Sequence, residues 1–360
     1  MRSFLFLIVL TVAGDLQARQ VTGVISDAET GRPLAGAHVF IAGTLIGTAA
    51  DEAGTFHLAS VPPGRHRFVG TMLGYETSGV DTTFVGSLLH LELRLTPTVL
   101  EAGTIEVVAR QDGRWQKNLE RFTRQFLGAS AAARAARIVN PEILDFDRAW
   151  WGRLRARASA PLVLEHDHLG YRTTYHLKEY DYTPSVLRYD GDPEFQELEP
   201  ATPEQAADWR ANRSAAFLGS YRHFLLSLLS DSLESQGFHL YRRPSLDRPT
   251  QSAYRFSTGP DRLISERDSA GVTLSFSGFV EIIFEPEMEE IAYLEELGTM
   301  RRPGPQVSWI KLNDGPTRID WSGTAIDPYG ITVYGYLAFE RVGDELPKEY
   351  RPAGVHLKPR

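Results

Sequence analysis

The sequence predicts two parts, a β-sandwich followed by an α+β domain with an antiparallel sheet. Short apolar runs alternate with glycine-containing turns between residues 21 and 95, which is typical of a small sandwich. After residue 115 the apolar spacing becomes helical, and strand-like runs return from residue 161 onward. Long helices among such strands indicate an α+β domain. We therefore place the sandwich at residues 19–110 and the α+β domain at residues 111–360.

We expect residues 1–18 to be a secretory signal peptide. Arg2 precedes an apolar run that is too short to span a bilayer, and small and polar residues follow it up to Ala18. No later run approaches the roughly 20 apolar residues of a membrane helix. The sequence has no cysteine, so neither a disulfide nor a lipidated cysteine can be present. These features predict an exported protein, in the periplasm or at the outer-membrane or cell surface, without a transmembrane helix.

Each strand of the predicted sandwich is bounded by turn chemistry. Residues 27–33 contain several turn formers, and Pro62 and Pro63 cannot donate to a central ladder. Leucine occupies every second position of residues 89–95, which predicts one packed and one solvated face. The expected strands are residues 21–25, 37–41, 55–58, 66–69 and 89–95.

These segments resemble the carboxypeptidase regulatory-like domain. The resemblance lies in Gly23-Val-Ile-Ser-Asp27, Thr30-Gly-Arg-Pro-Leu-Ala-Gly-Ala37, Asp51-Glu-Ala-Gly-Thr-Phe56, Val61-Pro-Pro-Gly64 and Leu73-Gly-Tyr75. It implies a seven-stranded, transthyretin-like (prealbumin-like) sandwich. In that family the sandwich is an accessory module, found beside metallocarboxypeptidases or in exported proteins of Bacteroidetes-type bacteria. The remaining chain is similar to the uncharacterised C-terminal region of such exported proteins, and this similarity implies no activity.

Three helices are expected in the second part. Trp115, Leu119, Phe122 and Phe126 share one helical face, and high helix propensity continues to residue 136. A second helix begins at residues 202–205, where Thr202 can cap, Pro203 suits the first turn and Gln205 completes a capping box. A third follows a break at Gly219-Ser220 and ends at Gly237.

The strands of the second part are predicted from short apolar or alternating runs. Residues 327–330, Asp-Pro-Tyr-Gly, carry a hairpin signal that would join the last two strands. We expect one domain here, because the helices need the sheet behind them to bury their apolar stripes. The expected strands are residues 161–164, 171–177, 271–276, 279–284, 317–321 and 331–337.

A metal site is one candidate for chemistry. His166 and His168 are two apart, so on a strand both imidazoles would point to the same side and could share an ion. His176 and Glu179 have the His-x-x-Glu form that metallocarboxypeptidases use. A metal-dependent hydrolase related to the carboxypeptidases is therefore one alternative. The other interpretation of these residues is a solvated hairpin.

A second candidate is a polar cluster around the break between two helices. Its members are Asn212, Arg213, Ser220, Arg222 and His223. A helix start with arginines beside it can bind an anion through free backbone N–H groups. The alternative is structural, with Ser220 capping the next helix and the arginines pairing with carboxylates.

The function that we expect is an exported, non-enzymatic binding or accessory protein with a protein or glycan partner at the cell envelope. No cofactor is expected, and the net charge of -8 argues against nucleic acid, whose binders need a basic face. No nucleophile elbow, phosphate loop, dinucleotide fingerprint or His-Glu-x-x-His motif occurs. Carbohydrate binding is a further alternative, because exposed tryptophans can stack on sugar rings. Its candidates are Trp150, Trp151, Trp309 and Trp321.

Overall fold

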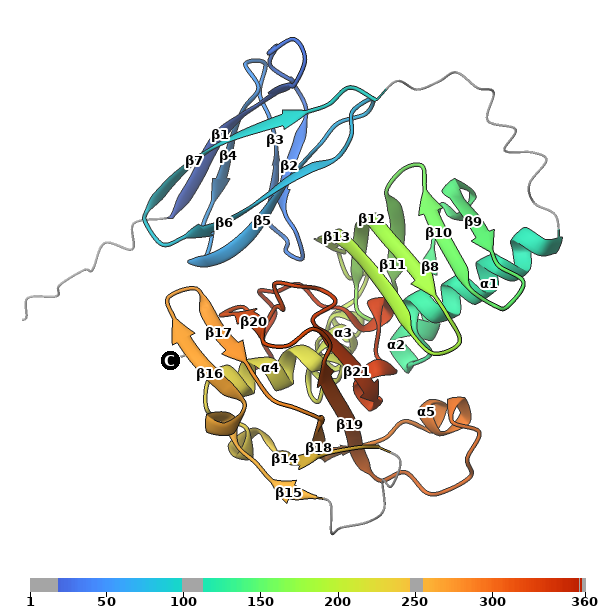
Figure 1. Cartoon of the computed structure of the whole chain (residues 1–360). Helices are drawn as coiled ribbons and strands as arrows, with labels where there is room; N and C mark the ends of the chain where they lie inside the picture. The colour runs from blue at the N-terminus through green and yellow to red at the C-terminus, as the bar shows by residue number, and fades with distance from the viewer. Residues whose placement is uncertain (1–18, 99–112, 247–254, 356, 358–360) are drawn as a thin grey trace, which may run out of the picture.

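The computed structural model describes residues 19–98, 113–246, 255–355 and 357. The predicted signal peptide at residues 1–18 lies outside the described residues. The described chain is rich in strands and has few helices. In Figure 1 the sandwich lies at the top, and a larger body lies below it. None of the described helices is long and apolar enough to cross a membrane.

The N-terminal sandwich consists of two facing sheets. One sheet has the order β4-β1-β7, and the other has the order β3-β2-β5-β6. Strand β1 pairs with β4 antiparallel and with β7 parallel. The strands are β1 (Gln20–Asp27), β2 (His38–Ile41), β3 (Gly47–Ala49), β4 (Thr55–Ala59), β5 (Gly64–Thr71), β6 (Ser78–Phe84) and β7 (Leu88–Leu95).

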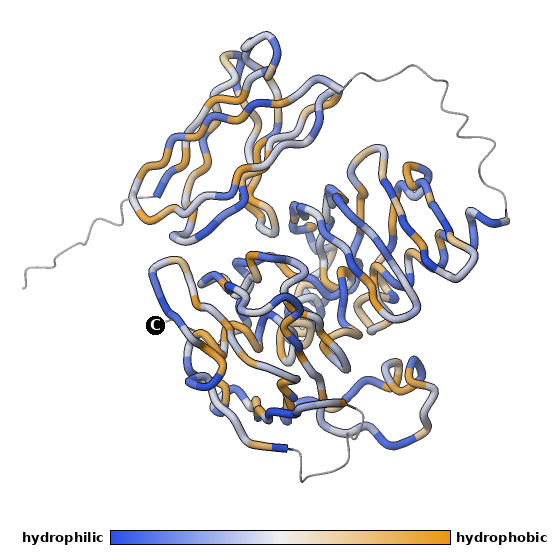
Figure 2. Tube along the Cα trace, viewed as in Figure 1, coloured by the Kyte–Doolittle hydropathy of each residue, from blue (hydrophilic) through white to orange (hydrophobic). Residues whose placement is uncertain are grey.

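The sandwich closes because alternate residues of its strands are apolar. Every second residue of β1 is buried, and the hydropathy alternation along the strands is visible in Figure 2. Val21 and Ile25 of β1 join Phe56 and Phe68 in a single apolar core. Gly23 lies between them with no room for a side chain, because a Cβ there would come 2.1 Å from the Leu91 carbonyl oxygen.

The body begins with helix α1 against a six-stranded sheet of order β8-β11-β12-β10-β9, with β13 also paired to β12. Phe122 and Phe126 of α1 (Gly113–Leu127) pack on Tyr180, with ring centroids 4.6 and 6.3 Å away. The expected helix to residue 136 is wrong, since Gly128 takes φ +101° and α2 (Ala131–Arg134) restarts with Ser130 as its cap. The strands are β8 (Ala136–Ile138), β9 (Leu144–Arg148), β10 (Leu154–Ala158), β11 (Leu162–His166), β12 (Tyr171–Tyr182) and β13 (Leu187–Glu197).

The rest of the body has a five-stranded sheet, β15-β14-β18-β19-β21, and a three-stranded sheet, β16-β17-β20. All strand pairs of the body are antiparallel among the residues that the structure describes, as the sequence predicted. The strands are β14 (Phe238–Arg243), β15 (Phe256–Ser257), β16 (Ile264–Asp268), β17 (Gly271–Leu274), β18 (Phe279–Met288), β19 (Pro305–Leu312), β20 (Thr317–Asp320) and β21 (Ile331–Gly335).

The expected hairpin between the last two strands is wrong. The backbone does turn at Asp327, whose carbonyl accepts from the Gly330 N–H at 3.1 Å. However, β20 pairs with β17 and β21 pairs with β19, so the turn carries the chain from one sheet to another. A turn signal fixes a local reversal but not which strands pair afterwards.

The predicted N-caps of both helices are confirmed, but the expected end of the third helix at Gly237 is wrong, since that helix ends at Leu229 and Gly237 closes a separate 3-10 turn. Thr202 Oγ1 accepts from the Gln205 N–H at the start of α3 (Pro203–Phe217), and the Gln205 side chain accepts from the Ala201 N–H. Ser220 Oγ accepts from the His223 N–H at the start of α4 (Tyr221–Leu229). The remaining helices are α5 (Ile291–Glu296) and the short 3-10 turns at Pro141–Ile143, Glu234–Gln236, Pro260–Arg262, Tyr336–Ala338 and Val342–Asp344.

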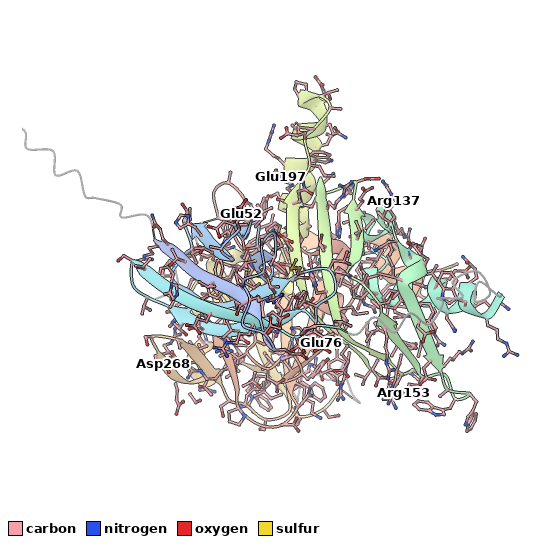
Figure 3. All side chains as sticks on the ribbon, turned by 90° about the horizontal axis from the view of Figure 1, so that it is seen from above. Glu52, Glu76, Arg137, Arg153, Glu197 and Asp268 are labelled. Atoms are coloured by element: carbon pink, nitrogen blue, oxygen red, sulfur yellow. The ribbon has the colours of Figure 1, made fainter. Side chains whose placement is uncertain are left out.

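Charged side chains lie at the periphery of both parts. Figure 3 labels Glu52 and Glu76 on the sandwich and Arg137, Arg153 and Glu197 at the six-stranded sheet, and all of these except the half-buried Arg153 are exposed. Charges at the rim are solvated and stabilise the fold little. Other charged side chains are enclosed between the sandwich and the body, among them Asp192.

Candidate functional site

The sandwich is joined to the body by the turn between β2 and β3. The Gly43 N–H donates to the Pro193 carbonyl at 2.6 Å, and the Thr44 carbonyl accepts from the Phe195 N–H at 3.0 Å. On its other side the Gly43 carbonyl accepts from the Lys348 N–H at 2.8 Å. Gly43 has φ +80°, and a Cβ there would come 2.9 Å from Lys348 Cε. Glycine therefore allows this turn to enter between two distant segments of the body.

Ion pairs reinforce the same junction. Asp192 of β13 is almost fully buried and accepts from Arg67 of the sandwich at 2.8 Å and from Lys178 at 2.7 Å. Two residues along β13, Glu194 lies 2.6 Å from His38 Nε2 of the sandwich. Alternate residues of β13 thus present carboxylates to the sandwich, where Arg67 and His38 meet them.

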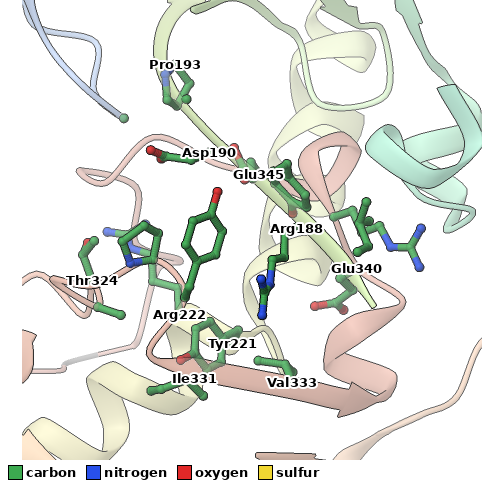
Figure 4. Close-up of a pocket in the computed structure, with 18 of the residues that line it drawn as sticks. Arg188, Asp190, Pro193, Tyr221, Arg222, Thr324, Ile331, Val333, Glu340 and Glu345 are labelled. Carbon is green, nitrogen blue, oxygen red and sulfur yellow. The ribbon is translucent and has the colours of Figure 1, made fainter. Parts of the chain in front are cut away.

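A cavity of about 1040 Å³ lies where the sandwich, β12–β13, the start of α4 and residues 320–348 meet. Figure 4 shows Tyr221, Arg222, Ile331 and Val333 on one side of it and Asp190 and Glu345 toward the other. The sandwich contributes polar side chains to this wall, namely Arg65, His66, Arg67 and Asp81. Phenol rings also line it, from Tyr175, Tyr182, Tyr189, Tyr221, Tyr329 and Tyr334.

Carboxyl groups without cationic partners line one part of the cavity. Glu340 Oε2 is buried and has no hydrogen-bond partner among the described residues. Burial raises the pKa of Glu340 well above its usual range, and the charges of Asp344, Glu290 and Glu287 raise it further. Burial also raises the pKa of Glu345 to about 7; the charge of Asp344 adds to the shift and that of Lys348 opposes it.

Asp344 holds this part of the cavity in place. Its carboxylate accepts from Ser130 Oγ at 2.5 Å and from the Arg341 N–H at 3.1 Å. Burial raises its pKa to about 7 in spite of these bonds. The Arg341 guanidinium is directed elsewhere, since it donates to the Ala338 carbonyl and to Gln125.

Cationic groups line another part of the cavity. Arg222 donates to the carbonyls of Pro347 and Lys348, while its buried Nε has no partner among the described residues. Burial lowers its pKa to about 9. Burial also lowers the pKa of Lys348, and within the described chain no hydrogen bond or ion pair is formed by its ammonium group. Asp320 is the strongest opposing charge near Lys348.

The structure divides the predicted polar cluster into separate sites. Asn212 donates to the His168 carbonyl at 2.9 Å. Arg213 is buried, donates to the Leu169 and Gly170 carbonyls and lies over the Tyr171 ring at 4.1 Å. These contacts brace the turn after β11, and neither side chain lines the cavity.

The other members of that cluster surround the break before α4. Ser220 donates to the Phe217 carbonyl at 2.7 Å, and the buried His223 accepts from the Gly219 N–H at 3.1 Å. Ser220 and Arg222 both line the cavity. Ligand binding by these two residues stays a prediction, whereas the structure assigns Asn212, Arg213 and His223 internal bonds.

A metal site was one of two alternatives for His166, His168, His176 and Glu179. The four candidates do not converge, and the described residues hold no group of three or more side chains placed to bind a metal ion. His166 lies 3.4 Å from the Gly343 carbonyl, and burial lowers its pKa to about 4. β11 ends at His166, which puts His168 beyond the strand. His176 lies on the other face of β12, stacked on Phe40 of the sandwich, and Glu179 accepts from the Tyr329 hydroxyl.

The four tryptophans proposed for carbohydrate stacking do not share a surface. Trp150 is 95% exposed and Trp151 47% exposed at the tip of the β9–β10 hairpin. The indole of Trp309, on β19, donates to Glu281, and that of Trp321 donates to the Asp268 carbonyl. Only the hairpin tip presents a tryptophan ring free for stacking among these four.

The cavity residues of the C-terminal segment were missed by the sequence prediction. Residues 340–349, Glu-Arg-Val-Gly-Asp-Glu-Leu-Pro-Lys-Glu, have the composition of a solvated loop. Their charges are enclosed because distant segments pack on them: Ser130 bonds to Asp344, and the sandwich contacts Lys348 through Gly43. Contacts with distant segments cannot be read from a local sequence pattern, so the sequence contained no signal that these charged residues are enclosed.

Comparison with known families identifies the first part of the chain. Residues 21–107 match the CarboxypepD_reg-like domain family. The match supports the predicted regulatory-like sandwich and does not extend to the body. The comparison with curated proteins gave no match.

Solved structures match only short stretches. A type II cohesin-X-dockerin complex from Acetivibrio cellulolyticus is 26% identical over 21% of this chain and 52% of that chain, with a TM-score of 0.19. The group B streptococcus pilus 2b backbone protein is 12% identical over 22% of this chain and 42% of that chain, with a TM-score of 0.21. Shaft pilin SpaA from Lactobacillus rhamnosus GG is 16% identical over 22% and 46%, with a TM-score of 0.18. The chain thus spans about half or less of these structures.

Proposed function

We propose that this protein is an exported, non-enzymatic binding or accessory protein that acts in the periplasm or at the outer-membrane surface and holds its ligand in the junction cavity. The observation that carries this proposal is the cavity itself, because the sandwich and the body each supply part of its wall. Neither part alone would enclose it. The regulatory-like sandwich is thereby given a role in recognition.

Buried polar groups support the proposal. A buried donor or acceptor without a partner costs free energy, and folded proteins keep few of them. Glu340 Oε2 and Arg222 Nε are two such atoms, and both residues line this one cavity. A ligand that bonds to these groups would recover the cost. At about 1040 Å³ the cavity is at the upper end of the roughly 300–1,000 Å³ of small-molecule sites.

Native mass spectrometry of the protein purified from the envelope fraction of its producing cells tests the cavity. Val333 lies on the cavity wall, so Val333→Trp would fill part of the space, whereas Met300→Trp adds the same indole at a fully exposed position. We expect a bound species on the wild type and on Met300→Trp that Val333→Trp has lost. Equal occupancy on all three folded proteins would contradict the proposal.

Cell fractionation tests the location. We expect the full-length precursor, when produced in a Gram-negative host, to be recovered from the periplasm or outer-membrane fraction with its first residues removed. Cytoplasmic protein of unprocessed mass would contradict export.

A further inference from the structure

The cavity is electrically two-sided. The carboxyl groups of Glu340, Asp344 and Glu345 lie in one part of it. Arg222 and Lys348 lie in another. If these opposite charges met directly, they would neutralise one another. No ion pair within 4.0 Å joins the two groups in the described chain, although the charge of Lys348 acts on Glu345 from a longer distance and lowers the pKa of that carboxyl.

The charges that surround Glu340 leave its carboxyl open to a positive group. Every charge that acts on it belongs to another carboxyl group, namely those of Asp344, Glu290 and Glu287. The nearest chain neighbour with a positive charge, Arg341, directs its guanidinium to backbone and amide oxygens of Gln125. A buried carboxylate in such surroundings favours a cation or a proton. If the partner is a cation, Glu340 can bind the positive group of a ligand.

Lys348 and Arg222 provide positive groups that can bind an anion. The Lys348 stem lies against Gly43 of the sandwich, which holds the ammonium group at the junction. Asp320 and Asp192 act on it from nearby, but Asp192 already accepts from Arg67 and Lys178. The unpartnered Nε of Arg222 adds a second donor. A carboxylate of a ligand can accept hydrogen bonds from the Lys348 ammonium group and from Arg222 Nε.

We infer that the cavity binds a dipolar ligand of the amino-acid or short-peptide class, with its ammonium or guanidinium group against Glu340 and Glu345 and its carboxylate against Lys348 and Arg222. This inference rests on the proposed binding function and specifies its ligand. A ligand with both charges compensates both parts of the cavity at once, whereas a singly charged ligand leaves one of them buried without a partner. The tyrosine rings of the cavity wall provide apolar area and hydroxyl groups for the backbone or stem.

Isothermal titration of the full chain with a matched series of probes tests this inference. The series runs from 4-aminobutyrate to 8-aminooctanoate, with the alkylamine and the alkanoate of each length as singly charged controls. We expect at least one length for which the amino acid binds about tenfold more tightly than both of its controls. The inference fails if no amino acid binds, or if a control binds as tightly as the best amino acid.

Paired substitutions then assign the two parts. With Glu345→Gln we expect about tenfold weaker binding of the best amino acid and of its alkylamine, with the alkanoate unaffected. The methionine of Lys348→Met still covers Gly43. With this variant we expect about tenfold weaker binding of the best amino acid and of its alkanoate, with the alkylamine unaffected. Glu142→Gln and Lys117→Met change exposed residues and should leave all affinities unchanged. A uniform loss for all three probes in both cavity variants would mean general damage and would overturn the assignment.

The result also separates this inference from the proposed function. If the natural ligand is lost from Val333→Trp but no ω-amino acid binds, then the cavity is a binding site for another class of ligand. If Val333→Trp keeps the natural occupancy and the probes do not bind either, the proposed function fails as well.

Discussion

The interior of the sandwich and the junction cavity differ in how they are filled. The sandwich core consists of apolar side chains such as Val21, Phe56 and Phe68, each at most 1% exposed. The junction instead encloses Glu340, Glu345, Lys348 and other charged groups around an open volume. The first region is built for stability. The second contains buried charged groups at an energetic cost, and such groups are common at ligand-binding and catalytic sites.

This comparison predicts that substitutions in the two regions have opposite signs. Truncation in the sandwich core removes favourable burial and should destabilise. Neutralisation of a cavity charge removes an unfavourable burial and should stabilise. The predictions below follow in order of expected size.

Phe68→Ala should have the largest effect. Phe68 lies on the inner face of β5 and is fully buried, so its loss should cost about 3–5 kcal/mol of unfolding free energy. Urea unfolding followed by circular dichroism measures this. Val80→Ala on the exposed side of β6 is the control and should change stability by less than about 0.5 kcal/mol. Equal effects of the two would show that the sandwich has no specific core.

Glu345→Gln should stabilise the protein above neutral pH. Burial raises the pKa of Glu345 to about 7 in the folded state, from an ordinary value of 4.5, so the folded protein holds this proton more tightly than the unfolded chain. Its contribution is therefore complete below about pH 4.5 and is lost as the pH rises through about 7.

At pH 8 we expect Glu345→Gln to be more stable than the wild type by about 1–3 kcal/mol, and at pH 4 to be equal to it. Unfolding free energies between pH 4 and 8 measure the difference. The pKa of Asp344 is raised to about 7 by burial too, so part of the slope should remain in the variant. A variant that is less stable than the wild type at pH 8 would show that Glu345 is paired in solution.

Gly43→Ala should weaken the docking of the sandwich. The substitution forces a side chain into φ +80° and places its Cβ against Lys348, which should cost about 1–2 kcal/mol. Hydrogen exchange should become faster at the Phe195 and Lys348 amides, which bond to this turn. Gly31→Ala is the control, because it has φ +69° with open space around it and should leave both amides protected. Faster exchange of these amides in both variants would show that the backbone strain of alanine at positive φ, and not the contact with Lys348, causes the change.

Ser220→Ala should have the smallest effect of the four. It removes the cap of α4, and we expect a loss of about 1 kcal/mol, measured as a shift of the urea midpoint. Ser235→Ala removes an exposed hydroxyl that bonds to a backbone carbonyl and should cost less. If Ser220→Ala also lowers the affinity for the cavity ligand, the predicted role of this residue in binding is supported.

Local features of the fold were predictable from the sequence. Thr202 and Ser220 were identified as caps because capping depends on residues within one turn. The five expected strands of the sandwich match β1, β2, β4, β5 and β7 because one of their faces is apolar. β6 was missed because its residues are mostly exposed or half-buried, and β3 because it is short.

Features that depend on distant contacts were not predictable. β13 carries Asp190, Asp192 and Glu194 at alternate positions, a pattern that predicts a solvated face, yet the sandwich covers Asp192. The His-x-His spacing predicted a shared face, but the strand ends at His166. The cavity could not be predicted for the same reason, because its walls come from segments on both sides of the domain boundary.

The turn that docks the sandwich also bears on the order of assembly. Leu45, next to Thr44, donates to a Glu349 carboxylate that is 304 positions away along the chain. During synthesis the sandwich can close long before its docking partner exists, since contacts within it are local by comparison. Formation of the junction must wait for the C-terminal segment and for closure of a very long loop. Because its walls include residues from Ala42 to Lys348, the charged cavity can be completed only once the C-terminal segment has reached the sandwich.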